Sequence, residues 1–378
     1  MALDNFARFH HLPPIAIVRS QVATPVAMPS NTLLPGRRTI LGAGVALAAA
    51  GIIAGRAWAA GDAPAASAAP PAGGIAIVMN SAGASISIVD MASHRQIREV
   101  PVLREPHHWT LSPDGSELWV GDAGGNALFA LDPTTGTRLG HRVLADPYQL
   151  WVSPDGRRLT VNALRFDHVD VYDAATLTLV NRFYAPSMPS HLTYAPDSSM
   201  VYSTLQGSDS VVAIDLTQNK VAWRAHVGPV PAGIIWHRDR LLVALMNGND
   251  VAVVDPTDGA VVGHIHTGEG AHIIQISPDR RVIYVGNRVA GTLDALDGTT
   301  LRPLARYTLA GGPDCIAFAP DGKLWISRRW RDSLAVMDPA DGAFDIIPVG
   351  RSPHGVFLSP MLKIFADEGR DGLGFASV

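Results

Sequence analysis

An aspartate recurs at a nearly constant interval along most of this chain, each time at the end of a β-branched or apolar run. Neighbouring members lie 40 to 42 residues apart, and the series is Asp90, Asp132, Asp173, Asp215, Asp255, Asp297 and Asp338. A period this regular indicates that one supersecondary unit is stacked repeatedly. The repeat therefore constrains the fold before any single residue is interpreted. We expect the aspartates themselves to form turns rather than to bind a ligand.

Each repeat unit contains four short strand-like segments and no helical period. A Pro-Asp-Gly turn follows the first segment most clearly at residues 113–115, 154–156 and 320–322. Proline presets φ in such a turn and glycine permits the conformation at its exit. The third segment alternates with a period of two and ends at the recurring aspartate, as in residues 211–215. These features predict an all-β fold whose unit is the four-stranded antiparallel blade of a β-propeller.

The two ends of the repeat region complement each other. Residues 75–102 supply only strands two to four of a unit, six complete units follow, and residues 353–360 supply only a first strand. Pairing the C-terminal strand with the three N-terminal strands would remove both open sheet edges. The sequence therefore predicts a closed seven-bladed β-propeller over residues 75–360. Residues 361–378 form a C-terminal tail to which the sequence assigns no role.

Short motifs within the repeats carry a family resemblance. The pattern Tyr-Val-Thr-Asn…Val-Ser-Val-Ile-Asp is echoed by Ile-Val-Met-Asn at residues 77–80 with Ile-Ser-Ile-Val-Asp at 86–90, and by Tyr-Val-Gly-Asn at 284–287. Over about residues 74–360 the chain resembles the YVTN-type seven-bladed propellers, a branch similar to the cytochrome d1-like propellers. Such propellers serve several unrelated functions, so the resemblance implies a fold and not an activity.

The N-terminal region carries export signals. Residues 37–38 are a twin arginine, residues 40–54 are weakly apolar, and residues 57–59 read Ala-Trp-Ala, the small-x-small form of a signal peptidase site. These features predict a Tat signal that is cleaved near Ala59-Ala60, which places the mature protein in the periplasm. The apolar stretch is too short and too weakly hydrophobic for a transmembrane anchor.

This signal sets the domain boundaries before the propeller. Residues 1–59 are assigned to an N-terminal extension with the Tat signal, and residues 60–74 to an Ala/Pro-rich linker. The long segment before the twin arginine leaves open whether translation begins at Met1 or at Met28.

Charge and cysteine content exclude several function classes. The chain has 30 basic and 34 acidic residues; residues 1–59 hold five Arg and one Asp, so the remainder has 25 and 33, a net −8. That balance argues against nucleic acid or an anionic membrane as the partner. Cys315 is the only cysteine, so no internal disulfide can form. We expect a monomer without a membrane span in the mature chain.

The beginning of each first strand lines the propeller channel, and two successive positions per blade stand out there. Aligned on the turn aspartates, the first position is His107, Tyr148, Ser190, Ala232, His272, Asp314 and His354. The second position is His108, Gln149, His191, Gly233, Ile273, Cys315 and Gly355. These positions hold five of the 14 histidines. Strand alternation predicts that members of the first series share one direction, and that His108 and His191 point the other way unless a bulge intervenes.

A histidine cluster at a channel mouth has several interpretations. Neutral imidazoles suit Zn, Cu or Fe, which makes His107, His272 and His354 candidate metal ligands for a metal ion or haem. The same three histidines, with Asp314 and Tyr148, are candidates for acid/base catalysis, because imidazole titrates near neutral pH. The alternative is a polar, wet channel whose imidazoles bind water and backbone carbonyls. No sequence-local ligand spacing decides among these interpretations.

The loop after the second strand of each blade supplies further candidates. Arg288 and Arg328 come from adjacent blades, and their pairing would form a clamp for a carboxylate or phosphate. Trp330 would stack on a ring or sugar. The full set of predicted ligand-binding residues is Arg288, Arg328, Arg329, Trp330, Asn287, Asn162, Arg165, His108 and His191. The alternative is that the asparagines form tight loops and the arginines pair with surface carboxylates.

Two function hypotheses follow. The favoured one is a periplasmic binding or accessory propeller that holds an anionic small molecule, a cofactor or a partner protein on its His/Arg-lined face. The other is an enzyme that uses the channel-mouth histidines, either a lactonase-like hydrolase or an oxidoreductase with a metal or d1-type haem. The identity of the cofactor, if there is one, stays open at this point.

Overall fold

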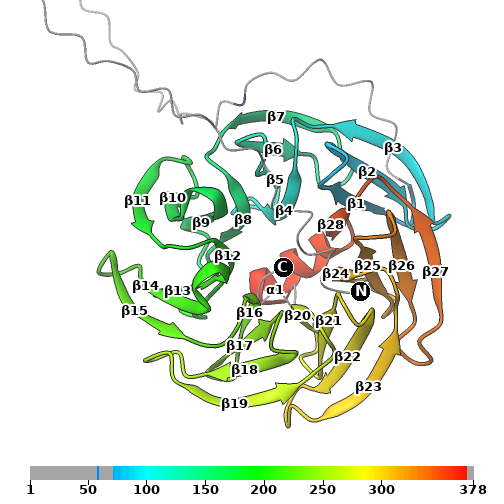
Figure 1. Ribbon diagram of the computed structural model, residues 1–378. Coiled ribbons are helices and arrows are strands. Elements are labelled where there is room, and N and C mark those ends of the chain that lie inside the picture. The colour runs from blue at the N-terminus through cyan, green and yellow to red at the C-terminus, as the bar shows by residue number, and fades with distance from the viewer. Residues whose placement is uncertain (1–57, 59–70, 373–378) are drawn as a thin grey trace, which may run out of the picture. The chain divides into compact units, whose positions relative to one another are not determined.

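The computed structural model describes residue 58 and residues 71–372, and within this part the chain forms seven four-stranded sheets arranged as a ring (Figure 1). The predicted twin-arginine signal, its cleavage site and most of the linker lie outside the described residues. Among the described residues, no helix is both long and apolar enough to cross a bilayer.

Each blade is an antiparallel meander, as the four-segment repeat predicts. The first blade is built from β28 (Pro353–Leu358), β1 (Ile75–Asn80), β2 (Ser85–Asp90) and β3 (Arg95–Pro101). The other blades use consecutive strands, four at a time: β4 (Pro106–Leu111), β5 (Leu118–Asp122), β6 (Ala127–Leu131), β7 (Arg138–Val143), β8 (Pro147–Val152), β9 (Arg158–Ala163), β10 (His168–Asp173), β11 (Leu179–Tyr184), β12 (Pro189–Tyr194), β13 (Met200–Leu205), β14 (Ser210–Asp215), β15 (Lys220–His226), β16 (Pro231–His237), β17 (Arg240–Leu245), β18 (Asp250–Val254), β19 (Val261–His266), β20 (Ala271–Ile276), β21 (Val282–Asn287), β22 (Thr292–Asp297), β23 (Pro303–Thr308), β24 (Pro313–Phe318), β25 (Leu324–Arg328), β26 (Ser333–Met337) and β27 (Phe344–Pro348).

The ring is closed by the two ends of the repeat region. β28 pairs antiparallel with β1, and Ala76 is opposite Leu358 while Val78 is opposite Val356. The C-terminal strand therefore completes the N-terminal blade, which confirms the predicted closure and the seven-bladed fold. Because every blade now has neighbours on both sides, the propeller has no open ends at which another chain could add a blade.

The recurring aspartates form turns. Each accepts a hydrogen bond from the backbone N–H two residues further on, at 2.8 to 3.1 Å, in all seven units. This is an Asx turn, in which a carboxylate replaces a backbone carbonyl as acceptor. The prediction that these residues are structural is confirmed.

Apolar side chains from neighbouring blades pack against each other and hold the ring together. Trp109 on β4 is fully buried, and its ring lies 4.9 Å from that of Phe357 on β28 and 6.4 Å from that of Trp151 on β8. Its indole N–H donates to the carbonyl oxygen of Val356 at 3.0 Å. One side chain thus links three blades, and truncation of such a residue costs about 3–5 kcal/mol.

The C-terminal tail contains a helix, which the sequence alone did not assign. α1 (Met361–Gly372) follows β28 directly and lies in the middle of the ring (Figure 1). Arg370 is buried and donates from Nη2 to the carbonyl oxygens of Leu111 at 3.0 Å and Ser112 at 2.7 Å, at the end of β4. His107 lies at the other end of β4. The helix therefore covers the end of the channel that is opposite the histidine positions.

Candidate functional site at the channel mouth

A β-bulge near the beginning of every first strand sets the direction of the channel-mouth side chains. In all seven blades, the pairing register between the first and second strand shifts close to the start of the first strand. A bulge adds a residue to one strand and re-aims the side chains beside it. His108 and His191 accordingly lie with the first-series histidines, which corrects the direction that plain strand alternation predicts for them.

The five channel histidines form one contiguous cluster. His107 and His354 lie 3.8 Å apart between ring centroids, and His108 lies 4.5 Å from His354. His191 then bridges the cluster, at 5.3 Å from His108 and 5.1 Å from His272. All five side chains are buried. The predicted candidate Tyr148 joins them, because its ring stacks on His107 at 4.1 Å.

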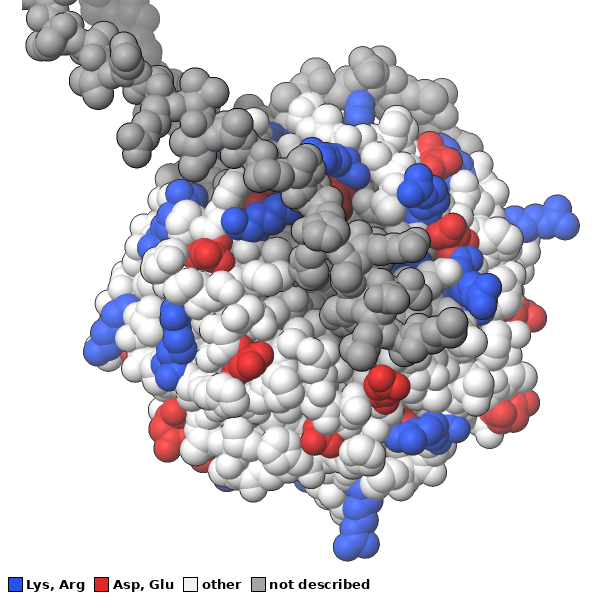
Figure 2. Space-filling view, viewed as in Figure 1, with Lys and Arg blue, Asp and Glu red and all other residues white. Residues whose placement is uncertain are grey.

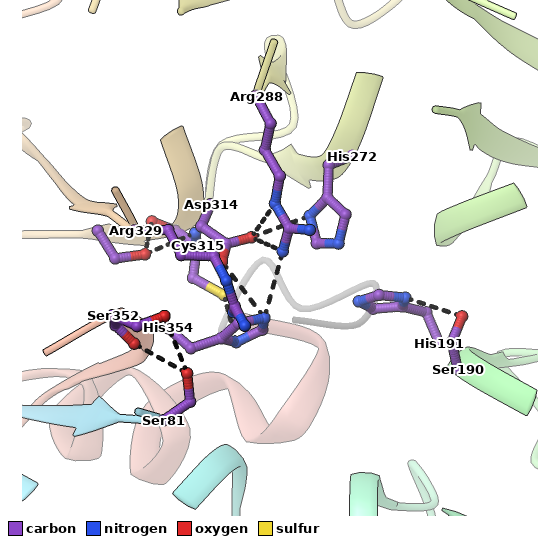
Figure 3. Close-up of polar contacts among 11 residues, drawn as sticks. Ser81, Ser190, His191, His272, Arg288, Asp314, Cys315, Arg329, Ser352 and His354 are labelled. Atoms are coloured by element: carbon purple, nitrogen blue, oxygen red, sulfur yellow. Dashed lines mark hydrogen bonds and ion pairs between the residues drawn. The ribbon is translucent and has the colours of Figure 1, made fainter. Parts of the chain in front are cut away.

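The buried carboxylate of Asp314 lies at the centre of the site and contacts its charged groups (Figure 3). Arg288 donates to its Oδ1 from Nε at 2.8 Å and also from Nη2, and Arg329 donates from Nη1 to Oδ2 at 3.1 Å. His272 Nδ1 lies 3.0 Å from Oδ1, and His354 Nε2 lies 3.4 Å from Oδ2. Four side chains from three blades therefore surround one carboxylate.

These neighbours fix the charge of the site. Burial by itself raises the pKa of Asp314, but Arg288, followed by His354 and His272, lowers it well below its ordinary value. Asp314 is therefore ionised, and with two guanidiniums the group carries one excess positive charge.

The imidazoles are neutral. Burial lowers the pKa of His108 to about 3 and that of His272 to about 4. Burial likewise lowers the pKa values of His107, His191 and His354 well below the ordinary value of 6.5. At pH 7 each ring therefore has one N–H donor and one nitrogen lone pair.

Several imidazole nitrogens have no hydrogen-bond partner within the described part of the chain. They are His107 Nδ1, both nitrogens of His108, His191 Nε2 and His272 Nε2. His272 Nδ1 lies at ion-pair distance from Asp314, but the alignment of the two groups falls short of a hydrogen bond. Leaving buried polar atoms unpaired costs about 1–3 kcal/mol each. So many in one place indicate a site that is completed by a ligand or by water.

Cys315 lies beside the cluster without forming an activated thiolate. Its Sγ is 3.4 Å from His354 Nδ1. Burial, reinforced by the charge of Asp314, raises the pKa of this thiol well above its ordinary value. A protonated, buried thiol is a poor nucleophile. Cys315 therefore serves as a small channel-lining side chain and not as a nucleophile.

The predicted arginine clamp has a different partner. The structure brings Arg329, rather than Arg328, together with Arg288. Arg328 donates from Nε to the carbonyl oxygen of Ala310 at 2.9 Å and from Nη1 to Ser333 Oγ at 3.2 Å, so the pairing of Arg328 with Arg288 was wrong.

Trp330, on the same loop, is 53% exposed, and its ring covers Gly312. A Cβ at Gly312 would approach this ring to 2.8 Å, and its φ of +69° also favours glycine. Trp330 thus covers a tight turn at the rim, outside the imidazole cluster.

The other predicted ligand-binding residues have structural partners. Asn287 donates to Thr292 Oγ1 and Asp294 Oδ2, each at 3.0 Å, within its own blade. Asn162 accepts from Ser203 Oγ at 3.0 Å. Arg165 is paired with Asp146 at 2.7 Å and with Glu105. The alternative interpretation, loop formation and ion pairing, describes Asn287 and Arg165, whereas Asn162 links its blade to the next one.

Sequence reasoning named every residue of the cluster but not its organisation. Ser190, whose Oγ lies 3.2 Å from His191 Nδ1, is a polar neighbour for which the sequence predicted no role. The signal for the central pair was present, because Asp314 occupies a channel position and Arg288 immediately follows the second strand of the preceding blade.

Comparisons with solved structures show the same fold at low identity. The dihydro-haem d1 dehydrogenase NirN in complex with DHE is 17% identical with a TM-score of 0.59, and the match covers 78% of each chain. The periplasmic gluconolactonase PpgL of Pseudomonas aeruginosa is 20% identical with a TM-score of 0.60, covering 75% of this chain and 98% of that one. Apo AztD of Citrobacter koseri is 11% identical with a TM-score of 0.54, covering 75% and 96%.

A search of curated proteins found no match. The family comparison is more specific than the structural one, because a single family model spans the repeats and the closing strand. That model, described as YNCE-like beta-propeller, matches residues 39–361, and the chain belongs to this family.

Proposed function

We propose that this protein is a periplasmic binding protein that holds a small anionic molecule at the mouth of the propeller channel. The observation that carries the proposal is the convergence of Arg288 and Arg329 on the single carboxylate of Asp314. One positive charge stays uncompensated there, since the surrounding imidazoles are neutral. A partly desolvated guanidinium is a strong donor for carboxylate or phosphate.

Access and donor capacity support this proposal. The side chains of Arg288 and Arg329 are 16% and 23% exposed, so solutes reach them, whereas Asp314 is fully buried. A guanidinium has five N–H groups, and Arg329 uses Nη1 for Asp314. Its remaining donors suit an anionic ligand. Figure 2 shows basic and acidic side chains dispersed over the visible face.

Isothermal titration of the purified protein with phosphate, citrate and gluconate at low ionic strength tests the proposal. We expect at least one of these anions to bind, and Arg329→Met to weaken binding at least tenfold, because a charge-assisted hydrogen bond contributes about 1.5–3 kcal/mol. Arg331→Met, on the same loop but outside the Asp314 cluster, is the matched control and should change affinity less than twofold. Equal losses in both variants, or no binding of any probe, would refute the site.

A second candidate, hydrolysis, rests on the His272–Asp314 pair. Asp314 lies 3.0 Å from Nδ1 of His272, and the ring's Nε2 has no partner within the described part. A carboxylate behind an imidazole is the arrangement that orients a general base. The pKa of about 4 makes this histidine a weak base at neutral pH, which places catalysis second to binding.

Lactone hydrolysis separates the two candidates. An enzyme should hydrolyse glucono-δ-lactone, and His272→Gln should reduce its turnover about 10²-fold or more, while the anion affinity of the same variant stays within threefold. Wild-type protein that binds an anion but gives only the background rate of hydrolysis would leave binding as the function.

A d1-type haem does not fit within the imidazole cluster. The rings of His107 and His354 are in contact at 3.8 Å, and Tyr148 covers His107 at 4.1 Å. A flat macrocycle has no place between side chains that already stack on one another. Haem chemistry is therefore not part of the proposed function.

We propose the periplasmic location on the twin arginine of the sequence, and a solved protein of this fold, PpgL, is a periplasmic gluconolactonase. Replacing Arg37 and Arg38 by lysine should retain the protein in the cytoplasm, since the Tat pathway reads the arginine pair. Cell fractionation with an antibody measures this, and Arg56→Lys serves as the control. Unchanged export of the double variant would contradict a Tat signal.

A further inference from the structure

We infer that His107, His108 and His354 form a binding site for one transition-metal ion of borderline softness, with Zn²⁺ as the reference ion. This site goes beyond the proposed anion binding and does not depend on it. It replaces His272, which was among the metal ligands expected from the sequence, by His108.

The geometry brings the three donors together. One ring nitrogen of each histidine lies within 4.8 Å of the other two, and all three side chains are buried. β4 supplies two of them because its bulge turns consecutive residues into the channel, and β28 supplies the third. Zinc–imidazole bonds of 2.0–2.1 Å in a tetrahedral site place ligand nitrogens about 3.4 Å apart. Small side-chain rotations therefore suffice to close the set around an ion.

The unpartnered nitrogens are an independent sign of a ligand. His107 Nδ1 and both nitrogens of His108 lack hydrogen-bond partners within the described part of the chain. A neutral imidazole has one lone pair, and coordination satisfies it where no N–H donor is in reach.

Asp314 lies behind one of the three ligands. Its Oδ2 is 3.4 Å from Nε2 of His354. Histidines that bind metal usually direct their other ring nitrogen to a carboxylate or carbonyl, which fixes the ring orientation. Asp314 is thus placed to orient His354 while Arg288 and Arg329 hold the carboxylate.

A competing donor set, Asp314, Cys315 and His354, also lies within 4.8 Å. It is less suited to an ion, because the Asp314 oxygens already accept from Arg288 and Arg329. Cys315 is fully buried, and a thiol must also lose its proton to bind zinc. The all-imidazole set requires neither change.

The positive charge beside the site determines what completes it. The two positive charges of Arg288 and Arg329 exceed the single negative charge of Asp314, and this excess positive charge repels the metal ion. Three protein ligands leave a fourth tetrahedral position open. A small anion from solution, such as hydroxide or chloride, would offset the charge there and stabilise the bound ion.

Zn²⁺ titration of the folded, chelator-treated protein in a buffer without phosphate or carboxylates tests the inference. We expect one Zn²⁺ per chain, and a loss of affinity of at least tenfold in His107→Gln and in His108→Gln. His191→Gln, a buried histidine of the same cluster, and His264→Gln, an exposed one on β19, should stay within threefold. Arg329→Met should still bind one Zn²⁺ per chain, because Arg288 alone holds Asp314 through two hydrogen bonds; Zn²⁺ binding without anion binding then separates this result from failure of the anion site.

Three outcomes would overturn the site: no Zn²⁺ bound by folded wild-type protein, loss of binding on His264→Gln, or loss on Cys315→Ser with retention in His108→Gln. Should the buried variants fail to fold, wild-type crystals soaked in Zn²⁺ decide the question. An anomalous peak about 2.1 Å from nitrogens of His107, His108 and His354 supports the site, and a peak elsewhere refutes it.

Discussion

At the scale of single residues, the histidines of the channel mouth are neutral and the carboxylate of Asp314 is ion-paired. His108 and His272 have pKa values of about 3 and 4 because they are buried, against an ordinary value of 6.5. The unfolded chain binds protons on these rings below pH 6.5, whereas the folded chain does not until the pH approaches 4 or 3. Their contribution to stability is therefore complete above pH 6.5 and is lost as the pH falls through that window.

The free energy of unfolding should accordingly decrease between pH 6.5 and pH 4, by about 1.4 kcal/mol per pH unit for each proton that only the unfolded chain binds. His108→Gln removes one such proton and should flatten the slope by that amount. Urea denaturation of metal-free protein at a series of pH values measures it, with His264→Gln as the exposed control. Parallel slopes for wild type and His108→Gln would show that His108 titrates normally in the folded protein.

At the scale of elements, the site is positioned by two features that cannot be read from the sequence period: a bulge and a helix. The bulge in β4 turns His107 and His108 into the channel together. Helix α1 covers the other end of the channel and is tied to β4 through Arg370, which donates to two backbone carbonyls. The strand that presents the histidines is thus fixed at its far end by the C-terminal helix.

Arg370→Met tests how firmly α1 is attached. The change removes two charge-assisted hydrogen bonds and leaves the carbonyls of Leu111 and Ser112 without this donor, so we expect stability to fall by about 1–3 kcal/mol. Lys363→Met is the control on the same helix; its side chain is 81% exposed, and it should change stability by less than about 0.5 kcal/mol. Thermal or urea unfolding measures the stability of both variants. Equal effects would show that the hydrogen bonds of Arg370 do not attach α1 firmly to β4.

At the scale of the whole molecule, stability depends on closing the ring. Blade one is assembled from both ends of the repeat region, so β28 supplies the innermost strand of a sheet whose other strands lie at the beginning. β28 also brings Phe357 into contact with Trp109 of the next blade. The first and last blades also contact each other directly, because the ring of His94 lies 5.5 Å from that of Trp325 and His94 Nδ1 lies 3.4 Å from Asp345 Oδ2.

Two truncated chains distinguish the contribution of ring closure to folding from the contribution of helix α1. A chain that ends after Ser352 lacks β28 and should not form a cooperative native state, because blade one loses its inner strand and both sheet edges open. A chain that ends after Pro360 keeps β28 and should fold, with a lower melting temperature than the full chain. Circular dichroism and size-exclusion chromatography distinguish these outcomes. A stable, monomeric product from the shorter chain would contradict the closure argument.

Much of the site was predictable at the level of positions. Asp314, Tyr148 and the five histidines were identified because the repeat aligns them against the invariant turn aspartates. The pairing of Arg288 with Arg328 was wrong, because the conformation of the loop after β25 decides which of two consecutive arginines faces the channel. Asn162, Asn287 and Arg165 are chemically suited to ligands, but hydrogen bonds and ion pairs within the propeller use them.

The sequence by itself determined the repeat, the number of blades and the way the ring closes, because a period of 40 to 42 residues and two complementary partial units admit few other arrangements. Only the tertiary structure decided which side chains meet. A one-residue bulge reverses side-chain direction without changing the period, and contacts such as that of Asp314 with Arg288 join residues of neighbouring blades. Periodicity specifies where strands lie, and packing and loop conformation specify what their side chains face.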